Sequence, residues 1–301
     1  MKEIGGYLEL AGGNQPLYHD GIYLNSGRNA LRFIVRKLGI RKLHVPAYTC
    51  PVVFDALQKE RVKIEQYALD SSFFPDCDFP KNDFIIYNNY FGVCGGKVRE
   101  MVKRYPNLIV DNAQAFYSRQ IGRAAFYSPR KFFGLPDGGI VCGLEGDAED
   151  FPRDVSWNRM TYLLKRVDLG ASAGYADFKK NSKVLARQDV KQMSALTTLL
   201  MSQLDCKYAA KRRLQNFNIL RGCLPTTFPM DTTDDDVPLV YPYAADAASV
   251  RPRLIDNKIY VPLYWSEVCN DVVMSEHIVS LPIDQRYGEY EMKRIVEVIK
   301  E

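Results

Sequence analysis

The chain of 301 residues is 47% hydrophobic and 25% charged, and its 40 basic and 36 acidic side chains leave a net charge of +4. This composition is that of a folded globular protein with room for a large core, and it excludes a disordered chain and a general affinity for nucleic acid. No apolar run is long enough for a membrane span, and seven cysteines without a C-x-x-C pair or a signal peptide predict reduced thiols in the cytoplasm.

Residues 1–20 are predicted to form an irregular N-terminal arm, because they carry glycine pairs and a proline but no periodic pattern. After them, apolar residues recur at helical spacing over 27–38, and Gly39 follows as a stop signal. Ser26 and Gly27 stand where this helix begins. There they either cap the helix in the ordinary way or present its free N–H groups to an anion such as a phosphate.

Strands and helices alternate along the next stretch of the chain. The hydrophobic pattern predicts helices over 51–60 and 97–104, and strands over 42–45, 62–67, 84–87 and 108–111. This alternation is typical of right-handed β-α-β crossovers, so we expect a mostly parallel central sheet flanked by helices. In such a sheet, ligands bind in the crevice outside the carboxyl ends of the strands.

Asp111 ends the strand predicted over 108–111, and an amide side chain, Gln114, follows three residues later. A carboxylate at this end of a parallel strand points into the crevice, where it would hold a pyridine nitrogen protonated and make the ring an electron sink. The alternative is that Asp111 is a turn or cap residue, which is common at strand ends.

Lys131 lies between two further predicted strands, 123–127 and 139–142. It follows Ser128 by three residues and precedes the glycine pair Gly138-Gly139. A lysine amine in this setting suits an imine with an aldehyde cofactor whose phosphate needs donors nearby. The alternative is a surface lysine in a loop, because S-x-x-K is a weak motif when taken alone.

From about residue 150 the pattern changes to charged helical stretches. Helices are predicted over 155–166 and 193–221, with a break at 170–175 between them. The last part predicts strands over 237–241 and 258–261 and a final amphipathic helix over 288–300, which together make a small α+β lobe.

The order of five stretches resembles the DegT/DnrJ/EryC1/StrS family of pyridoxal-phosphate-dependent sugar aminotransferases. These stretches are SGRNAL, VPAYTCPVVFDAL, NNYFG, VDNAQA and FYSPRKFFGLPDGGIV, and residues 193–205 and 280–301 are similar to later segments of the family. The resemblance implies an α/β fold of type I, with a mostly parallel sheet flanked by helices. It also implies a large cofactor domain over 21–205 and a small C-terminal α+β domain over 206–301.

The same resemblance implies a role for each candidate residue. Lys131 would carry pyridoxal 5′-phosphate, Asp111 would hold its ring nitrogen, and Gln114 would contact its ring hydroxyl. The other cofactor-binding candidates are the aromatic ring of Tyr48 and the residues Ser26, Gly27, Arg28, Asn89 and Ser128. Two of these depart from the family pattern: its phosphate serine usually lies further before the lysine than Ser128, and a histidine usually stands where Asn89 does.

Two further positions that depart from the family pattern, and one pair of aromatic residues, are expected to lie near the cofactor site. The family often has an asparagine and an arginine that reach the partner subunit's cofactor phosphate where Val190 and Gln192 stand, so Lys191 is a candidate substitute contact. Tyr264 and Trp265 lie where the family turns toward the substrate entrance. They would either stack on a sugar or pack between the lobes.

The resemblance therefore implies an aminotransferase that moves an amino group from an amino acid, glutamate in our hypothesis, to a keto-sugar nucleotide for polysaccharide or glycan precursors. It also implies a homodimer, and the three histidines lack metal-ligand spacing, which predicts no metal site. Two alternatives stay open. One is another reaction of the same cofactor such as dehydration, although relatives that dehydrate sugars replace the lysine with histidine. The other is a homologue that binds cofactor or sugar nucleotide without transamination.

Overall fold

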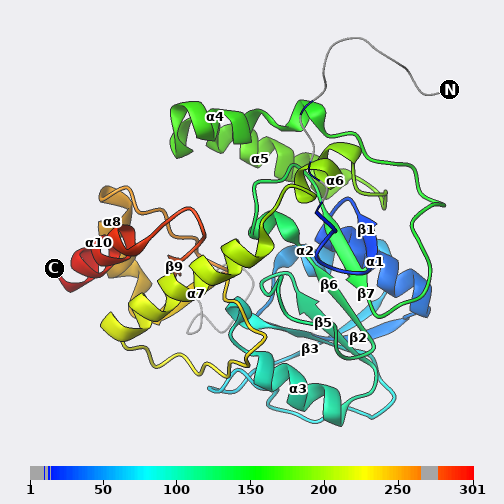
Figure 1. The fold of residues 1–301 in the computed structure, drawn as a ribbon. Coiled ribbons are helices and arrows are strands. Elements are labelled where there is room, and N and C mark those ends of the chain that lie inside the picture. Colours follow the sequence, from blue (N-terminus) through cyan, green and yellow to red (C-terminus); the bar gives the residue numbers. More distant parts are fainter. Residues whose placement is uncertain (1–9, 11–12, 14, 266–276) are drawn as a thin grey trace.

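A computed structural model describes residues 10, 13, 15–265 and 277–301 of the chain. Its centre is a seven-stranded sheet in the order β1-β7-β6-β5-β4-β2-β3 (Figure 1). The antiparallel strand is β7, which runs against both β1 and β6, and the other pairs are parallel, as predicted. The strands are β1 (Ile22–Leu24), β2 (Lys42–Pro46), β3 (Lys63–Tyr67), β4 (Ile85–Asn88), β5 (Leu108–Asn112), β6 (Ala124–Tyr127) and β7 (Gly139–Cys142).

Each face of the sheet has its own hydrophobic core. Helices α1 (Gly27–Leu38) and α2 (Pro51–Lys59) cover one face, where Ile86, Ile109 and Val141 are buried against them. Helix α3 (Gly95–Arg104) and the C-terminal part of the chain cover the other face, where Tyr87 and Val110 are buried. Because side chains alternate along a strand, neighbouring residues at a strand end face opposite sides of the sheet.

The C-terminal part forms a small lobe beside the sheet (Figure 1). Its two-stranded antiparallel sheet pairs β8 (Val240–Ala244) with β9 (Ile278–Pro282). Three helices pack with it: α7 (Cys206–Cys223), α8 (Ala247–Asp256) and α10 (Glu289–Lys300). The core of this lobe is continuous with the α3 face of the large sheet, and the domain boundary at 205/206 stays a prediction.

Some predicted elements were wrong between residues 150 and 221. Only Gly170, with φ of 87°, separates α4 (Thr161–Leu169) from α5 (Ala171–Arg187), so the predicted break over 170–175 is mostly the first turns of a helix. The predicted helix over 193–221 is divided into α6 (Ala195–Met201) and α7, because Asp205 starts a new helix by accepting a hydrogen bond from Tyr208 N.

The predicted strand over 258–261 was also wrong. Lys258 and Ile259 form the turn that ends α8, where their N–H groups donate to Ile255 O and Leu254 O, and Lys258 has a left-handed φ of 59°. Of the predicted arm, residues 10, 13 and 15–20 are described and form neither helix nor strand, and the rest lies outside the described residues. Within the described ranges, no helix is long and apolar enough to cross a membrane.

Candidate active site

The N-terminus of α1 meets the end of β6 at the carboxyl edge of the sheet. Ser26 caps the helix, because its Oγ accepts a hydrogen bond from Asn29 N at 3.3 Å. Gly27, the first helical residue, lies against Ser128: a Cβ on Gly27 would stand 3.3 Å from Ser128 Cβ. The structure therefore brings three predicted phosphate residues together, beside helix N–H groups that have no partner within the helix.

The glycine pair lets β7 start directly beside this helix end. Gly138 N donates to Asn25 O at 2.9 Å, and a Cβ on Gly139 would lie only 2.2 Å from Ser26 O. A side chain at Gly139 would thus push the strand away from the helix. The pair fixes the distance between the α1 N-terminus and the turn that carries Lys131.

Lys131 ends the short 3-10 helix Pro129–Lys131, whose turn is closed by a hydrogen bond from Lys131 N to Ser128 O at 3.1 Å. Its side chain is exposed, and its Nζ makes no hydrogen bond or ion pair with the residues that the structure describes. The amine is therefore accessible to a ligand, and no hydrogen bond or ion pair of the described residues depends on it.

Asp111 lies at the end of β5 on the α1 face, with Asn88 and Phe126 as its neighbours on the adjacent strands. Its side chain is buried, and one carboxylate oxygen accepts a hydrogen bond from Ala113 N at 2.8 Å. Burial raises the pKa of Asp111 to about 6, although the nearby Lys131 ammonium opposes this rise. Asp111 and Lys131, the two predicted catalytic residues, therefore lie close enough for their charges to interact.

Two buried amides beside Asp111 have polar atoms without a partner. Gln114 Oε1 accepts from Phe91 N at 2.8 Å, but Gln114 Nε2 has no partner. Asn88 Nδ2 donates to Thr49 Oγ1 at 2.8 Å, but Asn88 Oδ1 has none. Buried polar groups are normally paired, so these atoms indicate a missing ligand or water. The sequence analysis missed Asn88, although the alternation of β4 places it opposite Asp111.

Two arginines add positive charge next to the helix N-terminus. Burial and the nearby Arg130 both lower the pKa of Arg28, and neither guanidinium has a carboxylate within ion-pair distance in the described ranges. Arg130 Nε donates only to Leu135 O at 3.3 Å. Unpaired guanidiniums at a helix N-terminus suit an anionic group such as a phosphate.

Three other predicted residues have side chains that contact other parts of the protein. Tyr48 is buried in an aromatic cluster, with its ring nearly parallel to that of Tyr90 at 5.8 Å and edge-on to Trp265 at 4.9 Å. Asn89 has its amide engaged with Ser118 Oγ and Cys94 N. Lys191 Nζ lies 3.6 Å from Asp154. Their roles in cofactor binding stay predictions.

The Tyr264–Trp265 pair packs between the two lobes. Trp265 contacts Tyr48 and Tyr90 of the large sheet, and the ring of Tyr264 lies 6.0 Å from Phe91. The packing alternative therefore accounts for both rings in this structure. Stacking of the pair on a sugar stays a prediction.

A buried arginine of the small lobe holds the turn that carries Lys131. Arg213, on α7, is 1% exposed, and its guanidinium lies over the ring of Phe132 at 4.6 Å. It donates to Phe132 O at 3.3 Å, and Gln285 Nε2 donates to the same oxygen at 2.9 Å. The small lobe thus fixes the peptide that follows Lys131, a contact that the sequence analysis did not predict.

The residues at this edge fit pyridoxal 5′-phosphate chemically. The α1 N-terminus, Ser128 and two arginines suit the phosphate, the buried Asp111 suits a protonated ring nitrogen, and the free Gln114 Nε2 suits the ring oxygen. The exposed Lys131 amine suits the aldehyde.

Asp111→Asn is expected to stabilise the cofactor-free protein in a pH-dependent way. The pKa of Asp111 is about 6 in the folded state against 3.8 as the unperturbed value, so the cost of burying its charge is fully present above pH 6 and is lost as pH falls toward 3.8. Two pKa units correspond to roughly 3 kcal/mol. We expect urea unfolding to show the variant more stable by up to about 3 kcal/mol at about pH 8, and equal near pH 4. An equal difference at both pH values would contradict the assignment.

No protein-family model matches the chain, and no curated protein sequence matches it. Solved structures of similar fold cover nearly the whole chain. The sugar aminotransferase CalS13 from Micromonospora echinospora matches with a TM-score of 0.62 at 13% identity, over 93% of this chain and 86% of that one. A DegT DnrJ EryC1 StrS aminotransferase from Brucella abortus matches with 0.60 at 15% identity, over 94% and 85%.

The PMP form of Spr1654 from Streptococcus pneumoniae matches with a TM-score of 0.64 at 15% identity, over 93% of this chain and 86% of that one. The predicted fold class is therefore confirmed: the chain has the α/β fold of type I aminotransferases, and its structural neighbours include sugar aminotransferases and a DegT DnrJ EryC1 StrS aminotransferase.

Proposed function

We propose that this protein is a pyridoxal-phosphate-dependent aminotransferase that transfers an amino group from an amino acid to a keto-sugar nucleotide. The observation that carries the proposal is the unpaired Lys131 amine beside the buried Asp111, at the strand end that the α1 N-terminus also faces. Structural neighbours that are sugar aminotransferases support the substrate class.

In this proposal each residue acts on a stated atom. When bound, pyridoxal phosphate supplies an electron sink for charge that develops at the donor's α-carbon. Lys131 Nζ would bind the aldehyde group of the cofactor and, as a free amine, would take the proton from the donor's α-carbon. Asp111 would keep the ring nitrogen protonated, and Gln114 Nε2 would orient the ring oxygen.

The groups that suit an anion would serve both the cofactor and the substrate. Ser26, Gly27 and Ser128 surround the space at the helix end, and we assign them to the cofactor phosphate. Arg28 and Arg130 add two positive charges at the same edge, which would also attract the diphosphate of a sugar nucleotide. Glutamate is the donor in the proposal, and its carboxylates would benefit from the same charge.

A homodimer is part of the proposal. The α4–α5 pair projects from the large sheet (Figure 1), and it exposes large apolar side chains to solvent. Exposed apolar surface of this kind often marks an interface with another protein chain. Val167 is 84% exposed and Leu169 69% exposed. A second copy that covers this face would remove them from solvent.

The test of the proposed function follows the two half-reactions separately. Protein loaded with pyridoxal phosphate is mixed with glutamate, and we expect stoichiometric release of 2-oxoglutarate with a change in the absorbance of the bound cofactor. Keto-sugar nucleotides are then screened for amine formation by mass spectrometry. Cofactor binding without release of the keto acid, with any of the twenty amino acids as donor, would instead favour the homologue that binds without transamination.

A further inference from the structure

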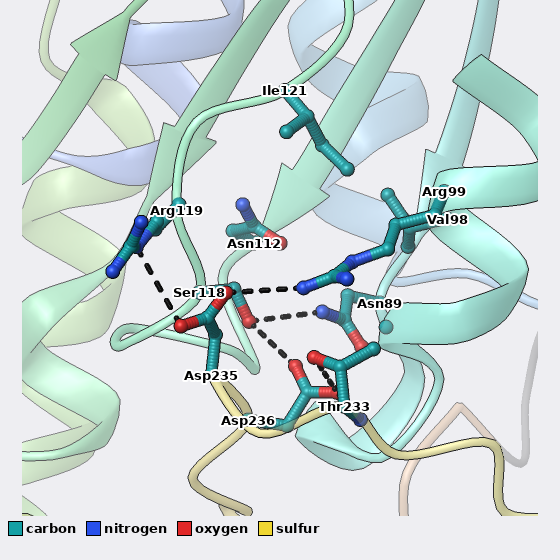
Figure 2. A pocket seen from close by; sticks show the side chains of 11 residues that line it. Asn89, Val98, Arg99, Asn112, Ser118, Arg119, Ile121, Thr233, Asp235 and Asp236 are labelled. Carbon is teal, nitrogen blue, oxygen red and sulfur yellow. Dashed lines mark hydrogen bonds and ion pairs between the residues drawn. The ribbon is translucent and has the colours of Figure 1, made fainter. Parts of the chain in front are cut away.

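A cavity of about 280 Å³ lies on the opposite face of the sheet from Asp111, between α3, the end of β5 and the 233–236 turn of the small lobe (Figure 2). Of the residues assigned above to the cofactor or to catalysis, only Asn89 lines it. Its apolar walls are Val98 and Ile121. The cavity is therefore separate from the candidate active site.

Asn112 carries the strongest sign of a missing ligand. It follows Asp111 in β5, so its side chain faces the other side of the sheet and lines this cavity. It is 1% exposed, yet neither its Oδ1 nor its Nδ2 has a hydrogen-bond partner. The nearby Tyr127 hydroxyl donates to Ser118 O at 3.1 Å; burial raises the pKa of this hydroxyl, and the neighbouring Asn112 amide lowers it. A fully buried primary amide whose oxygen and nitrogen make no well-formed hydrogen bond costs several kcal/mol, so a native protein rarely leaves one without a bound group.

The rest of the cavity floor is already satisfied by protein contacts. Ser118 Oγ donates to Asp236 at 3.0 Å and accepts from Asn89 Nδ2 at 3.1 Å. Asp236 also accepts from Thr233 N at 2.8 Å and Thr233 Oγ1 at 3.1 Å. Asn112 is thus the one floor side chain, among the lining residues, that offers both a free donor and a free acceptor.

The rim combines two cations with one anion. Arg99 lies 3.0 Å and Arg119 3.5 Å from the carboxylate of Asp235, as Figure 2 shows. Both arginines are largely exposed, so they can turn toward a ligand. Two guanidiniums that share one carboxylate keep N–H donors free for a ligand carboxylate, and Asp235 can accept from an ammonium group.

We propose that this cavity binds an amino acid with a carboxamide side chain. Its carboxylate would meet Arg99 and Arg119, its ammonium Asp235, and its side-chain amide Asn112. Two primary amides can exchange two hydrogen bonds, which satisfies both orphan atoms of Asn112 together. Such a ligand would lie on the other face of β5 from Asp111, and the inference does not depend on the proposed reaction.

Isothermal titration of the full-length protein with L-glutamine tests the proposal. We expect saturable binding in the wild type, weakened at least about tenfold by Asn112→Leu, because the reciprocal amide pair is lost. Arg99→Ala changes only the exposed rim and is expected to weaken binding similarly. L-Glutamate should bind at least about tenfold more weakly than L-glutamine, because its side-chain carboxylate offers Asn112 no donor and lies near Asp236.

Two controls separate this cavity from other sites. Asn107→Leu changes a partly exposed asparagine just before β5, whose amide donates to Asn82 O at 2.9 Å away from the cavity, and should leave the affinity unchanged. Lys131→Ala should also bind L-glutamine normally. Asn112→Leu should unfold at no lower temperature than the wild type, since it removes two unpaired buried polar atoms. No binding up to about 10 mM, or binding that Asn112→Leu and Arg99→Ala leave unchanged, would overturn the proposal.

Discussion

Lys131→Ala is expected to lower the rate of amino transfer by at least about 10⁴-fold without weakening the fold. The amine serves both as the covalent holder of the cofactor and as the proton carrier in the proposal, so both roles disappear with it. The fold should tolerate the change, because Lys131 is exposed and its Nζ bonds to none of the described residues. Steady-state assays of keto-acid release measure the rate, and urea unfolding measures the stability.

A trapping experiment identifies the lysine independently of turnover. Protein incubated with pyridoxal phosphate is reduced with borohydride and digested, and we expect the cofactor mass on the peptide that contains Lys131. Lys180→Ala, on the surface of α5, is the matched control and should keep both label and activity. A Lys131→Ala variant that retained the wild-type rate, or a label on another lysine alone, would show that the mechanism is assigned to the wrong residue.

The large lobe could be predicted because its pattern is local. The alternation of strands and helices fixes a mostly parallel sheet, and the rule that ligands bind at the carboxyl ends of the strands brings Asp111 and Lys131 together. The wrong predictions lie where one residue decides the outcome. Gly170 alone separates α4 from α5, and the turn at Lys258 ends a helix where the sequence had indicated a strand.

The candidate site was less predictable where it depends on register or on the small lobe. Asn88, and not Asn89, faces Asp111, and a shift of one residue in β4 exchanges the two faces. Asn89 instead turns to the α3 face, where it joins Ser118 and lines a different cavity. The hydrogen bond from Arg213 to Phe132 O joins residues that are 81 positions apart in the chain, so no local sequence pattern predicts it.

Arg213→Met is expected to lower the free energy of unfolding by about 3–5 kcal/mol. The guanidinium donates to Gln285 Oε1 at 2.9 Å, to Leu239 O at 3.1 Å and to Phe132 O at 3.3 Å, in a site where burial lowers its own pKa to about 10. Methionine fills a similar volume but leaves buried acceptors without a donor, and each such acceptor costs roughly 1–3 kcal/mol. Urea unfolding with a single transition would measure the loss.

Arg212→Met provides the matched control on the same helix. Arg212 is partly exposed and lies 5.8 Å from the ring of Tyr208, so its loss should cost less than about 1 kcal/mol. Because Arg213 also fixes the peptide after Lys131, its variant should trap less cofactor on Lys131 at equal protein concentration, while Arg212→Met should trap the wild-type amount. Equal stability losses in the two variants would mean that the buried guanidinium does not hold the lysine turn.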